Sequence, residues 1–118
     1  MEQEELIPGF ILELRRGTLI LCVLSQMKKP AYGYSLIDAL RTRGVPIETN
    51  TLYPLLRRLE TQGLLESQWN TQGAKPRKYY VITHLGKEVY TQLRTHWYST
   101  VANVNILLGE DEENDGSD

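Results

Sequence analysis

Residues 49–66, TNTLYPLLRRLETQGLLE, hold the pattern that decides the fold of this chain. The leucines of the pattern are Leu52, Leu55, Leu56 and Leu59. Their spacing of i, i+3, i+4 and i+7 places them on one face of an α-helix and leaves polar and cationic side chains on the other. Gly63 follows as a residue suited to a left-handed helix cap, and an extended segment begins directly after it. The stretch therefore predicts an amphipathic helix that leads straight into a strand.

Pro54 indicates where this helix begins. A proline in the first turn costs little, because the first backbone N–H groups of a helix have no intrahelical partner. The helix is therefore expected to start a few residues upstream, with its N-cap among residues 49–51. Thr51 and Tyr53 then lie at the helix N-terminus, where free N–H groups and the helix dipole favour an approaching phosphate.

Two strands are predicted after this helix, at residues 64–69 and 77–83. The segment between them is rich in Asn, Thr, Gly and Pro, which is a turn composition, and basic residues gather at its far end. A cationic helix followed by a basic hairpin is the arrangement of a winged helix-turn-helix. The expected fold class is α+β and mostly α, with a winged helix-turn-helix at residues 10–83.

Two further helices are expected before the leucine-rich helix. Residues 10–26 read as an apolar helix interrupted by Gly17, and residues 35–43 as a second helix ended by Gly44. The first of these helices is apolar on more than one face, so either its own domain or a second copy must cover it. Residues 1–9 precede it as an acidic N-terminal arm.

A long dimerisation helix is predicted at residues 84–108, with Thr83 as its N-cap. Its apolar residues are Leu85, Val89, Leu93, Trp97, Val101, Val104 and Leu108. They recur every three or four positions over about 37 Å, a length that one small domain cannot cover. The stripe therefore predicts a partner helix, most simply from an identical subunit. The acidic residues 109–118 are expected to form a disordered tail.

Charge is segregated along the chain. The overall net charge is −2, yet residues 28–94 contain 11 basic and 5 acidic residues. Six acidic residues and no basic residue lie at 109–118, so the overall balance hides a basic section. A basic helix and hairpin suit the phosphate backbone of DNA.

Nothing in the sequence predicts a membrane or secretory segment. No run of about 18 apolar residues is present, and the acidic start lacks the cationic region of a secretory signal. Cys22 is the single cysteine and lies in the apolar run ILCVL, as a buried structural thiol would. The expectation is a cytoplasmic protein with no membrane partner.

The predicted contacts with a double-stranded DNA operator form two groups. A helix fits the major groove with side chains toward base edges, while a basic wing and helix termini hold phosphates. The alternative is that the arginines only solvate a surface helix. The predicted DNA-binding residues are Thr51, Tyr53, Arg57 and Arg58 in the helix, and Lys75, Arg77 and Lys78 in the wing.

The order RGTLILCVL, YGYSLIDAL, TLYPLLRRLETQGLLES and RKYYVITHLG resembles the PadR family of bacterial transcriptional regulators. The likeness covers about residues 14–93, and the single helix after the wing resembles the short subgroup, which includes drug-responsive members. The resemblance implies a homodimer built on the last helix, and a repressor bound near promoters of transporter or detoxification genes. It also implies that the helix with Tyr53 and Pro54 is the recognition helix and that the wing touches the DNA backbone.

Trp97 is the second predicted site. Drug-responsive members have a tryptophan at the matching place, paired across the dimer axis around flat aromatic compounds. The resemblance thus implies relief of repression by a small planar hydrophobic ligand, which an indole can stack against. Val101 stands where those members carry an acidic residue, and an ordinary interface anchor is the alternative role of Trp97. The predicted ligand-binding residues are Trp97, Val101, Ile11, Leu14, Arg15 and Thr18.

Catalytic and metal groupings are not expected. His84, His96 and Cys22 fall on separate predicted elements, and no phosphate-binding glycine loop, nucleophile elbow or carboxylate pair is present. The expectation is a protein that is not an enzyme and has no cofactor. Two alternatives stay open: a winged-helix adaptor for protein interactions, and a regulator switched by a protein partner.

Overall fold

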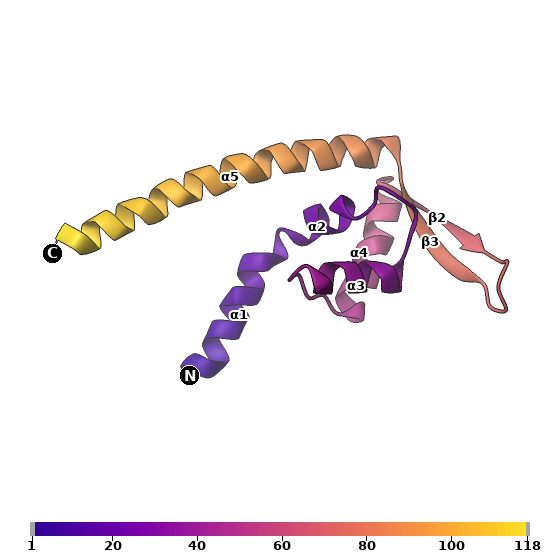
Figure 1. Cartoon of the computed structure of the whole chain (residues 1–118), viewed down its shortest axis with the longest axis horizontal. Helices are drawn as coiled ribbons and strands as arrows, with labels where there is room; N and C mark the ends of the chain where they lie inside the picture. Colours follow the sequence, from indigo (N-terminus) through magenta and orange to yellow (C-terminus); the bar gives the residue numbers. More distant parts are fainter. Residues whose placement is uncertain (1, 118) are drawn as a thin grey trace.

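The computed structural model describes the backbone of residues 2–117 and the side chains of residues 2–110. In chain order its elements are α1 (Gln3–Arg16), α2 (Leu19–Ser25), β1 (Ala31–Tyr32), α3 (Gly33–Thr42), α4 (Thr49–Thr61), β2 (Leu65–Asn70), β3 (Arg77–Ile82) and α5 (His84–Ser117). The strands form one antiparallel sheet in the order β1-β3-β2. Figure 1 shows the β2–β3 hairpin projecting from a body made by α2, α3 and α4. The predicted α+β, mostly helical winged helix is confirmed.

Helix α4 begins at Thr49, within the predicted range, although its N-cap is Glu48, whose side chain makes no capping bond. Pro54 lies in the second turn rather than the first, so the Asn50 carbonyl loses its intrahelical partner. Both residues are exposed, and water can satisfy that carbonyl. Gly63 has a φ of 84°, which confirms the left-handed cap expected after the helix.

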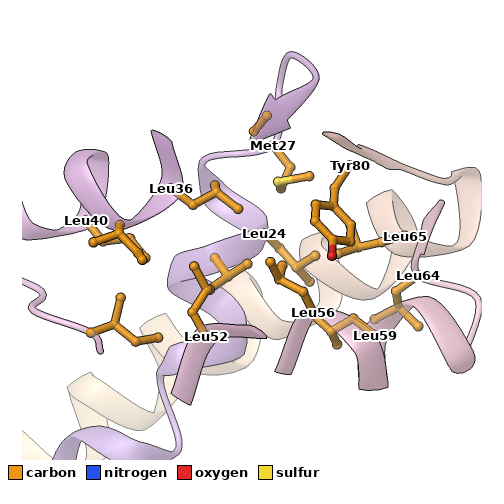
Figure 2. Close-up of a cluster of buried hydrophobic side chains, with 14 residues drawn as sticks. Leu24, Met27, Leu36, Leu40, Leu52, Leu56, Leu59, Leu64, Leu65 and Tyr80 are labelled. Carbon is orange, nitrogen blue, oxygen red and sulfur yellow. The ribbon is translucent and has the colours of Figure 1, made fainter. Parts of the chain in front are cut away.

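The hydrophobic core lies between α2, α3, α4 and the inner face of the sheet (Figure 2). Three of the four patterned leucines of α4 are fully buried in it, because the i, i+4, i+7 rows of a helix share one face. Leu55, at the edge of that face, is partly buried. The largest fully buried side chains are Leu24, Met27, Leu36, Leu52, Leu56, Leu59, Leu65 and Val23.

Alternation along β3 decides which side chains join the core. Tyr80 is buried and Ile82 packs against the core, whereas Arg77 and Tyr79 lie on the outer face. The two strands of the hairpin, β2 and β3, lie where two strands are predicted. The third strand, β1, was not predicted, since it is only two residues long and exists through its pairing with β3.

The N-terminal segment differs from the expected acidic arm at residues 1–9, because α1 already begins at Gln3. Glu4 and Glu5 lie in its first turn, where acidic side chains stabilise the positive end of the helix dipole. Six apolar side chains of α1 are nevertheless exposed, and none of its residues is buried. Helix α1 is therefore an apolar surface without a cover in this chain.

The apolar helix expected over residues 10–26 is two helices, broken at Gly17 and Thr18. The Thr18 hydroxyl donates to the Arg15 carbonyl at 2.7 Å, and the Thr18 N–H bonds to the same oxygen at 2.9 Å. These bonds close the end of α1. Only α2 therefore joins the core, through Val23 and Leu24.

Helix α5 is longer than expected. The prediction ended it at residue 108, followed by a disordered tail at 109–118, but the helix continues to Ser117; Asp118 lies outside the described residues. A single interior glycine such as Gly109 costs only about 1 kcal/mol relative to alanine, which does not stop a helix. Thr83 is the N-cap of α5, as predicted, because its hydroxyl accepts the Gly86 N–H at 3.0 Å.

Helix α5 projects far beyond the rest of the chain (Figure 1), which gives the molecule a long dimension of 66 Å. Its first turns pack on α2 and β3, and its later turns leave apolar side chains exposed. Neither α5 nor any other helix within residues 2–117 combines the length and apolarity needed to cross a membrane.

Candidate nucleic-acid interface

The solvent-facing side of α4 is a polar and cationic stripe. Asn50, Pro54, Arg57, Arg58 and Thr61 recur at i, i+4, i+7, i+8 and i+11, and all five are exposed. Among the described side chains neither arginine forms an ion pair. The helix therefore offers two free guanidinium groups and one carboxamide on the face opposite the core, which is the chemistry that reads base edges in a major groove.

The two residues predicted at the start of α4 have different surroundings. Thr51 is exposed at the edge of the polar stripe. Tyr53 is half-buried, and its ring covers Gly33 so closely that a Cβ there would lie 2.5 Å from the Tyr53 ring and hydroxyl. Tyr53 thus joins α4 to α3, a packing role that the sequence reading did not foresee.

The wing is the hairpin of β2 and β3 with the loop at residues 71–76. Lys75 is exposed in this loop. Arg77 begins β3, where its Nη1 donates to the Tyr34 hydroxyl at 2.9 Å and its guanidinium carbon lies 4.5 Å from the centre of the Tyr32 ring. Two predicted wing cations therefore reach solvent, one of them held by aromatic side chains.

Lys78, the third predicted wing cation, faces the core side of the hairpin. Its Nζ lies 3.7 Å from a carboxylate oxygen of Glu60, near the end of α4, and 5.5 Å from the Tyr80 ring centre. The other oxygen of Glu60 accepts a hydrogen bond from the Ser67 hydroxyl on β2. Glu60 thus ties α4 to both strands of the wing, and the charge of Lys78 is partly neutralised by it.

The predicted ligand-binding residues do not come together within one chain. Ile11, Arg15 and Thr18 line a groove of about 650 Å³ between α1 and the α3–α4 connection, whereas Leu14 projects into solvent. Trp97 and Val101 lie on consecutive turns of α5, which diverges from α1 in Figure 1. A site with all six residues would need two chains.

Several residues of the interface were missed by the sequence reading. Asn50 falls in the range predicted for the N-cap, although its i+7 relation to Arg57 also places it on the polar stripe. Tyr32, Tyr34 and Glu60 act through long-range contacts that no local pattern reveals.

Other ionisable groups lie away from the helix and wing. The hydrogen bond that Arg94 on α5 makes with the Tyr98 hydroxyl raises the pKa of this guanidinium, which is charged in either case. Within the described residues, no three His, Cys, Asp or Glu side chains gather as a metal site.

The buried leucine face of α4, its exposed cationic stripe and the adjoining hairpin define a winged helix-turn-helix protein. The chain belongs to the PadR-like family of transcriptional regulators, whose family model matches residues 20–92. Regulators of this family bind DNA and typically dimerise. They are transcriptional regulators rather than enzymes, as the sequence predicted.

Two solved structures and one sequence relative are similar to this chain. The crystal structure of a PadR family transcriptional regulator from Eggerthella lenta is 50% identical, with a TM-score of 0.83 over 89% of this chain and 94% of that protein. A PadR-like transcriptional regulator from Bacillus cereus is 30% identical, with a TM-score of 0.73 over 81% of this chain and 96% of that one. The Transcriptional regulator Rv3488 of Mycobacterium tuberculosis is 31% identical over 83 residues, which cover 70% of this chain and 78% of that protein.

Proposed function

We propose that this protein is a homodimeric repressor that binds a specific double-stranded DNA operator through α4 and its wing. The observation that carries the proposal is the exposed stripe of α4, with two arginines that no described carboxylate neutralises. Arg57, Arg58 and Asn50 contact base edges, and Thr51 and Lys75 contact phosphates. Tyr53 supports α4 by packing on Gly33 of α3, and its hydroxyl edge faces the DNA backbone.

The direct test of DNA binding is a mobility shift with the DNA upstream of the protein's own gene. Retardation at low salt that weakens as salt rises is expected, because counterions are released when basic side chains neutralise phosphates. A folded dimer that retards no DNA at low salt would contradict the proposal. That result would favour the winged-helix adaptor for protein interactions.

Exposed apolar side chains support the homodimer. On α1 they are Leu6, Ile7, Phe10, Ile11, Leu12 and Leu14, and on the later turns of α5 they include Val104, Ile106, Leu107 and Leu108. Apolar surface of this extent on two helices marks an interface. A second copy covers both helices at once, since α5 extends beyond its own domain and reaches the partner.

Leu14→Asp is expected to convert the dimer to a monomer. Leu14 is 80% exposed in one chain, so the substitution leaves the fold intact, whereas a carboxylate buried in the interface loses its hydration. Light scattering after size exclusion should report 13.6 kDa in place of twice that mass. Glu13→Ala, the neighbouring exposed position, should stay dimeric. A dimeric Leu14→Asp protein with native circular dichroism would exclude α1 from the interface.

We further propose that a small planar hydrophobic ligand relieves repression by binding between the subunits at Trp97 and Val101. Trp97 is 41% exposed on α5 and offers an indole face for stacking. Ile11, Leu14, Arg15 and Thr18 complete the site from α1. A ligand held there changes the distance between the two α4 helices, which must match half-sites about 34 Å apart.

Fluorescence can isolate Trp97, because the chain has only two tryptophans. In the Trp69→Phe protein, the planar dye proflavine should quench most of the emission, since Trp97 alone is left to emit and stacks on the dye. The converse protein, Trp97→Phe, should show little quenching. Equal quenching of both proteins would contradict a site at Trp97 and leave a regulator switched by a protein partner.

A further inference from the structure

An aromatic cluster lies where the wing meets α3. The Tyr32 and Tyr34 rings stack with centres 5.6 Å apart at 15°, and Tyr79 on β3 meets the Tyr32 ring edge-on at 6.0 Å. The Asn70 side-chain amide at the end of β2 donates to the Tyr32 hydroxyl at 2.8 Å. The Tyr32 ring is therefore fixed by both long strands of the wing and by the first turn of α3.

Arg77 is held by this cluster from two directions. Its guanidinium lies over the Tyr32 ring at 4.5 Å, and one of its five N–H groups is used by the Tyr34 hydroxyl at 2.9 Å. Arg77 and Tyr34 are both exposed, so the other N–H groups face solvent. Stacking on an aromatic face and one hydrogen bond restrict the long side chain while its charge stays available.

The three wing cations consequently differ. Lys75 lies in the loop without an aromatic platform, and Lys78 is paired with Glu60. Arg77 alone of the three combines a fixed position with an exposed charge that no described carboxylate offsets. A cation fixed before binding loses less conformational entropy when it meets its partner.

We propose that Tyr34, with Tyr32 as the stacking platform, is a positioning residue that presents Arg77 to one phosphate of the DNA backbone. The inference rests on the proposed DNA-binding function. In this arrangement the guanidinium donates free N–H groups to two oxygens of the same phosphate, the bidentate geometry that suits arginine. Tyr34 acts through Arg77 and sets the register of the wing on the duplex rather than reading sequence.

The test is a double-mutant cycle on a 30-base-pair random-sequence duplex, because phosphate contacts act on any sequence. Fluorescence anisotropy at several salt concentrations gives Kd and its salt slope. Tyr34→Phe, which removes only the hydroxyl, should weaken binding about threefold. Arg77→Ala should weaken it about tenfold and lower the magnitude of the salt slope by about 0.9, the value expected when one phosphate is no longer neutralised. The double variant should bind no more weakly than Arg77→Ala alone.

Tyr98→Phe is the matched control, because Arg94 and Tyr98 form the same kind of pair on α5, away from the wing. It should leave Kd unchanged. A Tyr34→Phe protein with wild-type Kd, or a double variant whose two effects multiply, overturns the positioning role. If the wild type binds upstream DNA as proposed, that outcome refutes this inference alone. If the wild type binds no duplex at low salt, the proposed function fails with it.

Discussion

Gly86→Ala is expected to lower the free energy of unfolding by about 3 kcal/mol or more. Gly86 lies in the first turn of α5, where an added Cβ would overlap the Leu64 carbonyl oxygen and lie 2.7 Å from Cγ1 of Ile82. The carbonyl oxygen cannot retreat freely, because it accepts the Thr83 N–H at 3.0 Å. Making room for the methyl group would therefore push α5 off the start of β2 and break the bond that anchors its N-cap.

Gly109→Ala is the matched control in the same helix. Apart from its chain neighbours and the nearby helix backbone, no described atom lies within 4 Å of the Cβ it would add, and its φ is not positive, so alanine should be neutral or up to about 1 kcal/mol more stable. Urea denaturation followed by circular dichroism at 222 nm gives both values. Equal, small effects of the two substitutions would show that α5 does not pack closely on the hairpin.

The parts of the fold that the sequence predicts are those set by neighbours along the chain. The leucine spacing of α4 requires one buried face whatever covers it, and Leu52, Leu56 and Leu59 are indeed buried. Gly44 and Gly63 both adopt positive φ because a left-handed residue ends a helix at low cost only as glycine. Thr83 caps α5 for an equally local reason.

The parts that were missed depend on partners distant in sequence. Strand β1 consists of two residues and exists because Tyr32 meets Tyr79 across the sheet. Arg77 and Lys78 are both cations at the start of β3. Arg77 nevertheless stacks on Tyr32 and bonds to Tyr34, which is 43 residues away, whereas Lys78 pairs with Glu60 on α4. Sequence gives the charge of the wing, and tertiary contacts decide which charges remain available to DNA.

The length of α1 and α5 also escaped prediction, for a different reason. Helix α1 extends into an acidic segment in which no described residue is buried, and α5 extends into a segment of polar and acidic composition. Composition predicts disorder for such segments, while intrinsic propensity and the favourable position of Glu4 and Glu5 near a helix N-terminus allow helix. Where burial does not set the end of a helix, a boundary predicted from the hydrophobic pattern makes the helix too short.

Arg57→Ala combined with Arg58→Ala is expected to lower affinity for the upstream DNA at least about 30-fold. Each arginine that contacts a base contributes about 1–3 kcal/mol, and 1.4 kcal/mol corresponds to a tenfold change in Kd. Both side chains are exposed and lie on the face of α4 opposite the buried leucines, so their removal should leave stability nearly unchanged. Mobility shifts at fixed salt measure the reduced affinity, and thermal melting verifies that the fold is kept.

The matched control is Lys87→Ala combined with Arg94→Ala, which removes two exposed cations from α5. It changes the net charge by the same amount but leaves α4 intact. Equal reductions in affinity for the two proteins would mean that α4 contributes only general charge.

Comparing upstream DNA with a random duplex then separates the roles of the arginines, since base contacts add affinity for one sequence and phosphate contacts add it for all. If Arg57 and Arg58 read bases, their removal lowers the ratio of the two affinities toward one. If they touch only phosphates, both affinities fall together and the specificity of α4 rests with Asn50.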